Sequence, residues 1–145
     1  MANRLNLKEL IPDSYQIFTQ MSQLVANSGI DKLQQELIKI RASQVNGCAF
    51  CMHIHSKDAV QYGEDPKRLY VLSAWREAKK WFSKEDQVIL ALTEEITLIA
   101  DNGLSDQTYQ EAIALFGEET TAKLIFAVIH INTLNRVGVS LNMHP

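Results

Sequence analysis

Apolar residues recur along this chain with the spacing of helices rather than of strands. No window alternates apolar and polar residues as a half-buried strand would. The six glycines and three prolines are few, and they fall where helices would begin or end. The first predicted helix spans Asp13 to Asn27, and one of its sides carries Ile17, Met21, Leu24 and Val25. The pattern therefore predicts an all-α fold.

Capping residues and helix breakers divide the chain into about six to seven helices. Asp31, with Gln34 three residues later, predicts the start of a helix that runs to Val45 and ends at Asn46-Gly47. The other helices are predicted over 48–62, from Asp65-Pro66, over 83–100, over 104–117 and over 120–141. We therefore expect a single-domain helical bundle.

Two details of the later helices are also predicted. The last helix is apolar on nearly all sides from Leu124 to Ile131, which indicates a central position and a buried His130. Glu94-Glu95, in the helix predicted over 83–100, is expected to lie on a solvated face.

Chain length sets the domain organisation. The chain has 145 residues, of which 46% are hydrophobic and 21% charged, enough for one domain with a substantial core. We expect a single domain over 1–145, in which residues 1–12 form an arm. The arm has leucines but no helical stripe, so it needs another surface, such as a neighbouring subunit.

Charge and hydropathy exclude several classes of partner. With 14 basic and 17 acidic residues, a net charge of −3, the chain has no basic stripe that would attract nucleic acid or anionic lipid. No segment has the apolar run of a secretory signal or of a membrane span, which needs roughly 20 residues. We therefore expect a cytoplasmic protein with neither nucleic-acid nor membrane partners. In that reducing compartment a cysteine pair is redox-active, metal-binding or inert.

The segment NGCAFCMHIH, residues 46–55, contains both cysteines of the chain. On a helix, Cys48, Cys51 and His55 fall within a sector of about 60°, whereas His53 points the other way. Three residues of helix separate the two Cα atoms by about 5 to 6 Å, which a disulfide can span. The first turn of a helix also lowers the pKa of a thiol. The pair is therefore a candidate redox centre.

A carboxylate on the preceding helix can complete this centre. Glu36 lies at the edge of the apolar stripe of that helix, eleven residues before Gly47, and His55 lies eight residues after it. In an antiparallel hairpin, residues at similar distances from the turn face each other. We therefore expect a relay in which Glu36 orients His55, and His55 accepts the proton of Cys51.

These motifs resemble those of a known family. Glu36, CAFC and His55 have the spacing of the catalytic signature of the AhpD-like alkylhydroperoxidase branch of the carboxymuconolactone decarboxylase family. Three segments carry the likeness: RASQVNGCAFCMHIHSKDA, RLYVLSAWRE and INTLNRVGVSLNMHP. The larger founding enzyme has two copies of the domain and a histidine between its cysteines, where this chain has one copy and Ala49 and Phe50.

The resemblance implies an all-α, AhpD-like fold and a thiol-dependent peroxidase that reduces alkyl or hydrogen peroxide. Cys51 would be the peroxidatic thiol, Cys48 the resolving one, and Glu36 and His55 the proton relay. A dithiol or a thioredoxin-like protein would supply the electrons. The resemblance further implies a homo-oligomer, a trimer or hexamer. We expect neither a cofactor nor a metal ion to take part.

Other interpretations of the cysteine pair remain open. Cys48, Cys51, His55 and Glu36 could together bind zinc, although structural zinc sites more often draw on two separated pairs of ligands. The pair could also act in disulfide reduction or redox sensing without peroxidase turnover, or be inert core residues.

Overall fold

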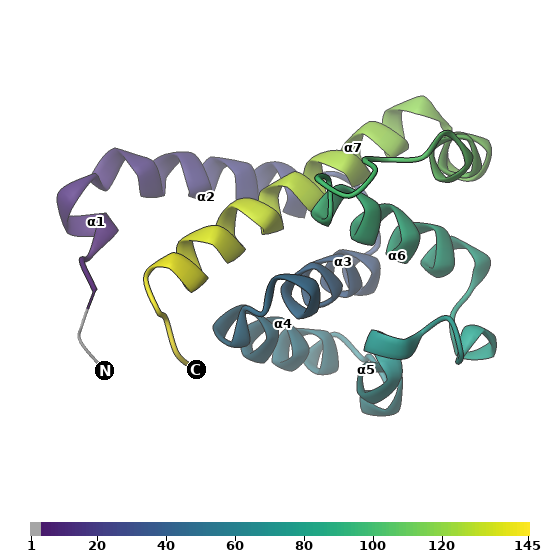
Figure 1. Ribbon diagram of the computed structural model, residues 1–145, viewed down its shortest axis with the longest axis horizontal. Coiled ribbons are helices and arrows are strands. Elements are labelled where there is room, and N and C mark those ends of the chain that lie inside the picture. Colours follow the sequence, from purple (N-terminus) through teal and green to yellow (C-terminus); the bar gives the residue numbers. More distant parts are fainter. Residues whose placement is uncertain (1–3) are drawn as a thin grey trace.

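The computed structural model describes residues 4–145, and within this range every regular element is a helix. The α-helices are α1 (Leu7–Leu10), α2 (Pro12–Ala26), α3 (Lys32–Asn46), α4 (Ala49–Gln61), α5 (Pro66–Val71), α6 (Lys84–Thr97) and α7 (Asp106–Ser140) (Figure 1). Short 3₁₀ turns at Leu72–Ala74 and Lys79–Trp81 connect α5 to α6. The predicted all-α fold is confirmed.

Side-chain caps set the start of the two helices that lead into the core. The carboxylate of Asp31 accepts the backbone N–H groups of Leu33 and Gln34 at the start of α3. Ser83 and Asp86 form a reciprocal capping box at the start of α6. The side chain of Gln34 does not complete such a box; it donates to Asp86, 3.5 Å away, and so links the starts of α3 and α6.

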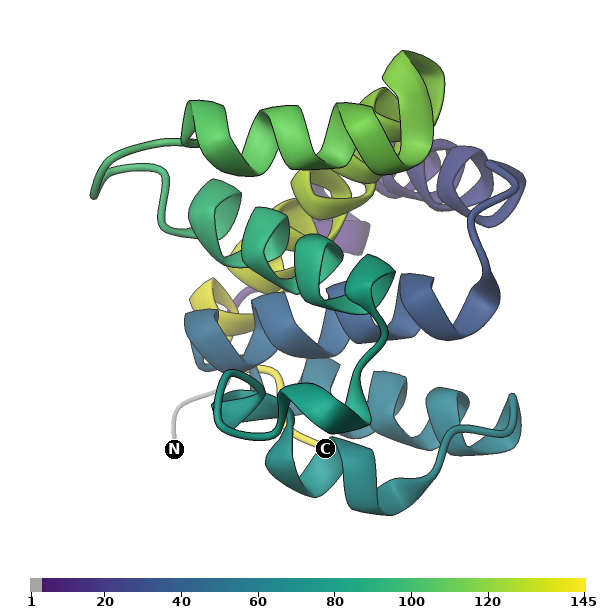
Figure 2. The same cartoon turned by 90° about the vertical axis from the view of Figure 1, so that its right-hand side faces the viewer.

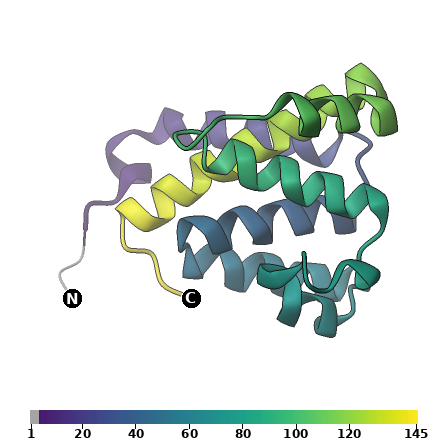
Figure 3. The ribbon, with the colours of Figure 1, turned by 45° about the vertical axis from the view of Figure 1, so that its right-hand side comes forward.

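Helix α3 is the central element of the bundle. It contacts α4 on one side and α6 and α7 on the other, as Figures 2 and 3 show. Ile38 and Ala42 join the apolar cluster shared with α6 and α7, whereas Leu37 and Ile40 join the cluster that contains Leu72, Trp75 and Phe82. Because α3 is buried on both sides, the side chains of Leu37, Ile38 and Ile40 each contribute roughly 2 kcal/mol through their burial.

The last two predicted helices form one long element with a break. Gly117 has non-helical backbone angles, φ 77° and ψ 170°, inside α7, at the residue where the sequence predicted a stop. Beyond this break α7 crosses the bundle and contacts α2, α3, α4 and α6. The predicted central position of this segment and the burial of His130, which is 4% exposed, are confirmed.

The amino-terminal segment only partly follows the prediction. Residues 1–3 of the predicted arm lie outside the described residues. Leu7–Leu10 is a short helix, and Arg4 donates to the backbone oxygen of Ser140 at 2.5 Å, so this segment contacts the end of α7. On α2 Val25 is buried, but Ile17 and Leu24, predicted on the same side, are 56% and 63% exposed.

The expectation of a solvated face at Glu94-Glu95 was wrong for Glu94. Its carboxylate is buried and accepts hydrogen bonds from Arg41 at 2.7 Å, from Trp75 Nε1 at 2.9 Å and from Arg76. Burial alone would raise the pKa of Glu94, but these donors lower it overall. Glu94 therefore joins α6 to α3 and to the segment after α5.

Within the described part of the chain, no helix has both the length and the apolar character needed to cross a membrane.

Candidate redox site

The turn between α3 and α4 determines where the cysteines lie. Gly47 ends α3 in the left-handed conformation, φ 67° and ψ 29°, which glycine adopts without strain. The backbone N–H of Cys48 then donates to the carbonyl oxygen of Ser43 at 2.9 Å, across the end of the helix. As a result Cys48 becomes the N-cap residue of α4, in agreement with the predicted start of this helix.

Cys48 and Cys51 are joined by a disulfide, and their Cα atoms are 5.4 Å apart. This distance agrees with the one expected from three residues of helix. Both residues are buried: Cys48 is 2% exposed and Cys51 6%. The backbone N–H of Cys51 donates to the sulfur of Cys48 at 3.3 Å. The amino-terminal end of α4 thus presents a backbone donor to one sulfur of the pair.

Helix α7 packs closely against this disulfide through Gly138. A Cβ atom at this position would lie 3.0 Å from the sulfur of Cys48 and 3.5 Å from that of Cys51. The missing side chain is therefore what allows the backbone of α7 to approach the sulfurs. Sequence reasoning did not identify this contact, because it joins residues about ninety positions apart.

Glu36 and His55 meet across the α3–α4 hairpin. Nδ1 of His55 lies 2.9 Å from Oε2 of Glu36, and Nζ of Lys39 lies 2.7 Å from Oε1. Glu36 is only 3% exposed. Burial alone would raise its pKa, but the hydrogen bond with His55 and the charge and hydrogen bond of Lys39 lower it overall. His55 lies one turn after Cys51 on α4, so the carboxylate, the imidazole and the sulfur pair occupy neighbouring positions.

One group of possible metal ligands includes this pair. Glu36, His55 and Asp58 each offer a ligand atom, and these atoms lie within 4.8 Å of one another. Lys39 already provides a positive charge at Glu36. The four-ligand zinc set of the sequence analysis requires thiolates, which the two sulfurs are not while they form a disulfide.

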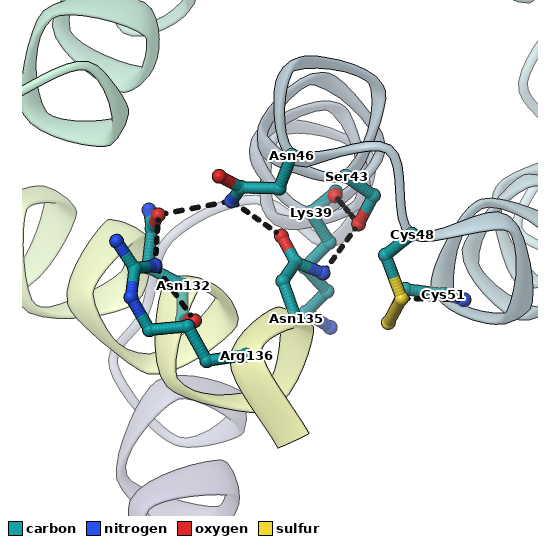
Figure 4. Close-up of a disulfide and its surroundings, with 8 residues drawn as sticks. All are labelled: Lys39, Ser43, Asn46, Cys48, Cys51, Asn132, Asn135 and Arg136. Atoms are coloured by element: carbon teal, nitrogen blue, oxygen red, sulfur yellow. Dashed lines mark hydrogen bonds between the residues drawn. A yellow bond between two sulfur atoms is a disulfide. The ribbon is translucent and has the colours of Figure 1, made fainter. Parts of the chain in front are cut away.

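Sequence reasoning missed a polar network that joins α7 to the turn before the cysteines (Figure 4). Asn135 donates to Ser43 Oγ and accepts from Asn46, whose amide also donates to Asn132. Asn132 in turn accepts from Arg136. Two asparagines in an otherwise apolar helix were the available signal, since buried amides need hydrogen-bond partners.

Two of the other histidines, His53 and His130, take no part in the Glu36–His55 pair. His53 is exposed and lies in a groove on another side of α4, together with Met52 and Tyr70. The Nε2 atom of His130 lies 2.9 Å from Ser22 Oγ on α2. Burial above all, and then the charges of Lys39 and His55, lower the pKa of His130 to about 4.

A helical bundle with a CxxC disulfide at the start of a helix and a buried carboxylate-histidine pair beside it defines an AhpD-like protein. The sequence profile of the carboxymuconolactone decarboxylase family matches residues 12–94. The chain belongs to this family.

Comparisons with individual proteins agree with this assignment. The chain is 36% identical over 141 residues to the uncharacterized protein YdfG of Bacillus subtilis (strain 168), covering 97% of this chain and 95% of that protein. It also resembles the crystal structure of ATU0492 from Agrobacterium tumefaciens, a protein of unknown function assigned provisionally to the antioxidant defence protein AhpD. The TM-score is 0.94 with 30% sequence identity, and 99% of each chain is covered.

A second solved structure, an uncharacterized peroxidase-related protein from Silicibacter sp. TM1040, has a TM-score of 0.81. The two chains are 19% identical, and the match covers 96% of this chain and 80% of the other. This likeness supports the fold alone.

Proposed function

We propose that this protein is a thiol-dependent peroxidase that reduces alkyl or hydrogen peroxide through the Cys48–Cys51 pair. The single observation that carries the proposal is the disulfide at the start of α4, one turn from an imidazole that a buried carboxylate holds. A redox-active pair, a base and a group that orients the base are the parts that thiol-based catalysis requires.

The oxidative half of the cycle uses both sulfurs. The thiolate of Cys51 attacks the terminal oxygen of the peroxide, the O–O bond breaks, and the leaving alkoxide takes a proton to become an alcohol. Cys51 is then a sulfenic acid. The thiolate of Cys48 attacks this sulfur, hydroxide leaves and is protonated to water, and the disulfide forms.

His55 and Glu36 provide the proton transfers in this scheme. His55 accepts the proton of the Cys51 thiol and returns it to the leaving oxygen. Glu36, kept ionised by its two donors, orients the imidazole and stabilises its protonated form. Lys39 balances the charge of the carboxylate when His55 is neutral.

A dithiol or a thioredoxin-like protein completes the cycle by thiol-disulfide exchange. Its thiolate attacks one sulfur, the other leaves as a thiolate, and a second thiol of the donor resolves the mixed disulfide. Cys51 is the more exposed residue of the pair. The backbone N–H of Cys51 donates to the sulfur of Cys48 and favours the Cys48 sulfur as the leaving thiolate. We therefore place the first attack at Cys51.

The proposal also covers the oligomeric state, the domain organisation and the compartment of the enzyme. The exposed Ile17 and Leu24 on α2, with Leu10 and Ile11 beside them, supply apolar surface that a homo-oligomer would cover. Because α3 contributes to both apolar clusters, we propose that residues 1–145 act as one domain. A reducing compartment such as the cytoplasm would return the disulfide to the dithiol after each cycle.

Peroxide consumption tests this function directly. The reduced protein is mixed with hydrogen peroxide or cumene hydroperoxide and an excess of dihydrolipoamide, and the wild type is compared with Cys51→Ser and Cys48→Ser. The wild type should consume many equivalents of peroxide, whereas both variants should lose turnover. A Cys51→Ser variant with the wild-type rate would overturn the proposal.

The same preparation separates the alternatives. A wild-type protein that reduces a small disulfide but consumes no peroxide is a disulfide reductase. Stoichiometric zinc in protein purified without chelator, together with no turnover of either substrate, would instead indicate a metal-binding module.

A further inference from the structure

The side chain of Asn135 bonds to two residues at the end of α3, directly before the turn that leads to the cysteines (Figure 4). Its Nδ2 donates to Ser43 Oγ at 2.9 Å, in the last full turn of α3. Its Oδ1 accepts from Nδ2 of Asn46 at 2.9 Å, at the end of that helix. Asn135 is fully buried, with an exposed fraction of 0%. One amide of α7 therefore holds two residues of the last turn of α3.

Both of these partners are themselves fixed. Ser43 Oγ donates to the backbone oxygen of Lys39 at 2.6 Å, so this hydroxyl has a defined direction and accepts from Asn135. The amide of Asn46 also donates to Oδ1 of Asn132 at 3.0 Å. Since a buried amide that loses its partners incurs a desolvation penalty, the bonded geometry is strongly favoured over a displaced turn.

The position of Ser43 in turn determines the position of Cys48. Ser43, whose hydroxyl Asn135 holds, accepts the backbone N–H of Cys48 with its carbonyl oxygen at 2.9 Å. The sulfur of Cys48 in turn accepts the N–H of Cys51 at 3.3 Å. Ser43 therefore connects Asn135, through its hydroxyl, to the residue that caps α4, through its carbonyl oxygen.

Asn135 also influences how closely the backbone of α7 approaches the two sulfurs. Gly138 lies three residues after Asn135, and its backbone packs against the sulfur of Cys48. Because Asn135 ties α7 to the end of α3, it fixes both the capping residue and the surface that covers it.

We propose that Asn135 is a positioning residue for the cysteine pair, which keeps the sulfur of Cys48 over the backbone N–H of Cys51 by holding Ser43 and Asn46. The proposal rests on the dithiol chemistry proposed above. The new element is the role of α7: through Asn135, this helix influences how readily Cys48 forms a thiolate and departs as one during reduction.

Thiolate formation at Cys48 provides the test. The Cys51→Ser protein, which retains one thiol, is titrated by its thiolate absorbance near 240 nm with and without Asn135→Ala. Loss of the network should lower the thiolate fraction at neutral pH by about three- to tenfold, as expected when one charge-stabilising hydrogen bond is weakened. With both cysteines present, Asn135→Ala should also shift the equilibrium constant for reduction by dithiothreitol.

Leu124→Ala is the matched control. Leu124 is a core residue of the same helix, 1% exposed, and lies eleven residues before Asn135 in the apolar cluster that α7 shares with α3 and α6. The Leu124→Ala substitution should lower the stability of the fold while leaving the thiolate titration and the dithiothreitol equilibrium unchanged. Equal effects of Asn135→Ala and Leu124→Ala on these two readouts would overturn the proposal.

Ser43→Ala keeps the test decisive if Asn135→Ala does not fold. It removes one of the two bonds of Asn135 but retains the carbonyl that accepts from Cys48, so a smaller decrease in the thiolate fraction is expected. An unchanged titration in the folded Ser43→Ala protein would count against the proposal. Neither readout depends on peroxide, so failure of peroxidase activity and failure of the positioning role give different results.

Discussion

Glu36 and His55, from two helices that meet in a hairpin, share a hydrogen bond of 2.9 Å between Oε2 and Nδ1. Lys39 occupies the other carboxylate oxygen at 2.7 Å. Despite its burial, which opposes ionisation, the pKa of Glu36 lies below its ordinary value of 4.5. A fixed negative charge therefore lies beside the imidazole at neutral pH.

The first prediction concerns this charge. Glu36→Gln keeps the shape of the side chain and an oxygen toward His55 but removes the negative charge. The rate of peroxide reduction should fall at least about tenfold, because the imidazole loses the partner that stabilises its protonated form. The remaining activity should move to higher pH. Steady-state peroxide consumption between pH 6 and 9 measures both effects.

An exposed carboxylate serves as the control for this variant. Glu119→Gln removes a charge that is paired with Lys123 on the surface of α7, and it should leave the rate and its pH profile unchanged. If Glu36→Gln behaves like Glu119→Gln, the carboxylate has no part in the relay, even where the thiol chemistry holds.

Local patterns were sufficient to predict the cysteine turn. Gly47 supplies a left-handed residue, and Cys48 follows it directly, so the N-cap position and the 5.4 Å separation of the Cα atoms depend on neighbours in the sequence. The meeting of Glu36 and His55 could also be predicted, because a hairpin pairs residues at similar distances from its turn.

Longer-range contacts could not be predicted in the same way. Glu94 reads as a surface residue, and its burial depends on Arg41 and Trp75, which come from separate parts of the chain. Asn135 and Gly138 contact the cysteine turn only because α7 crosses α3 there. Helical periodicity indicates which side of a helix is apolar, but it does not identify the residues that this side will meet.

The second prediction concerns the contact between α7 and the disulfide. Gly138→Ala would place a Cβ atom 3.0 Å from the sulfur of Cys48, closer than normal packing allows. The disulfide fixes both sulfurs, whereas free thiols can rotate away, so the variant should destabilise the oxidised form more. The oxidised form should lose about 1 to 2 kcal/mol more stability than the reduced form. For a two-electron couple, 1.4 kcal/mol corresponds to a change of about 30 mV in the reduction potential.

Equilibration with dithiothreitol measures this effect, and the reduction potential should become less negative. Ser140→Ala, an exposed position in the same turn of the helix, is the control and should leave the potential unchanged. An unchanged potential in Gly138→Ala would mean that the backbone of α7 moves away from the sulfurs at little cost.

The third prediction concerns the buried ion pairs of Glu94. Glu94→Gln leaves the side chain of Arg41, which is only 15% exposed, without its carboxylate partner. Removing one member of a buried ion pair is expected to lower the free energy of unfolding by about 2 to 4 kcal/mol. Urea denaturation followed by circular dichroism gives this value. Glu111→Gln, which affects an exposed pair with Lys84, should change the stability little, and an equally small effect of Glu94→Gln would contradict the prediction.

The fourth prediction concerns the pH dependence of stability. His130 is buried, its Nε2 lies against Ser22 Oγ, and its Nδ1 has no hydrogen-bond partner among the described residues. Its pKa falls from 6.5 to about 4, because burial above all disfavours the charged ring. The unfolded chain therefore binds a proton at His130 before the folded protein does, so stability is lost as the pH falls from about 6.5 toward 4.

Between about pH 7 and pH 4.5 the free energy of unfolding should fall by roughly 2 to 3 kcal/mol. Urea denaturation at the two pH values measures this change. Glu36 and Glu94 contribute little in this window, because their lowered pKa values cost stability only once the unfolded carboxyls bind protons, near and below 4.5. His130→Gln retains a polar group toward Ser22 but does not titrate, so its stability should depend less on pH. If the wild type and His130→Gln lose the same stability over this interval, another group carries the acid sensitivity and the imidazole is protonated without cost.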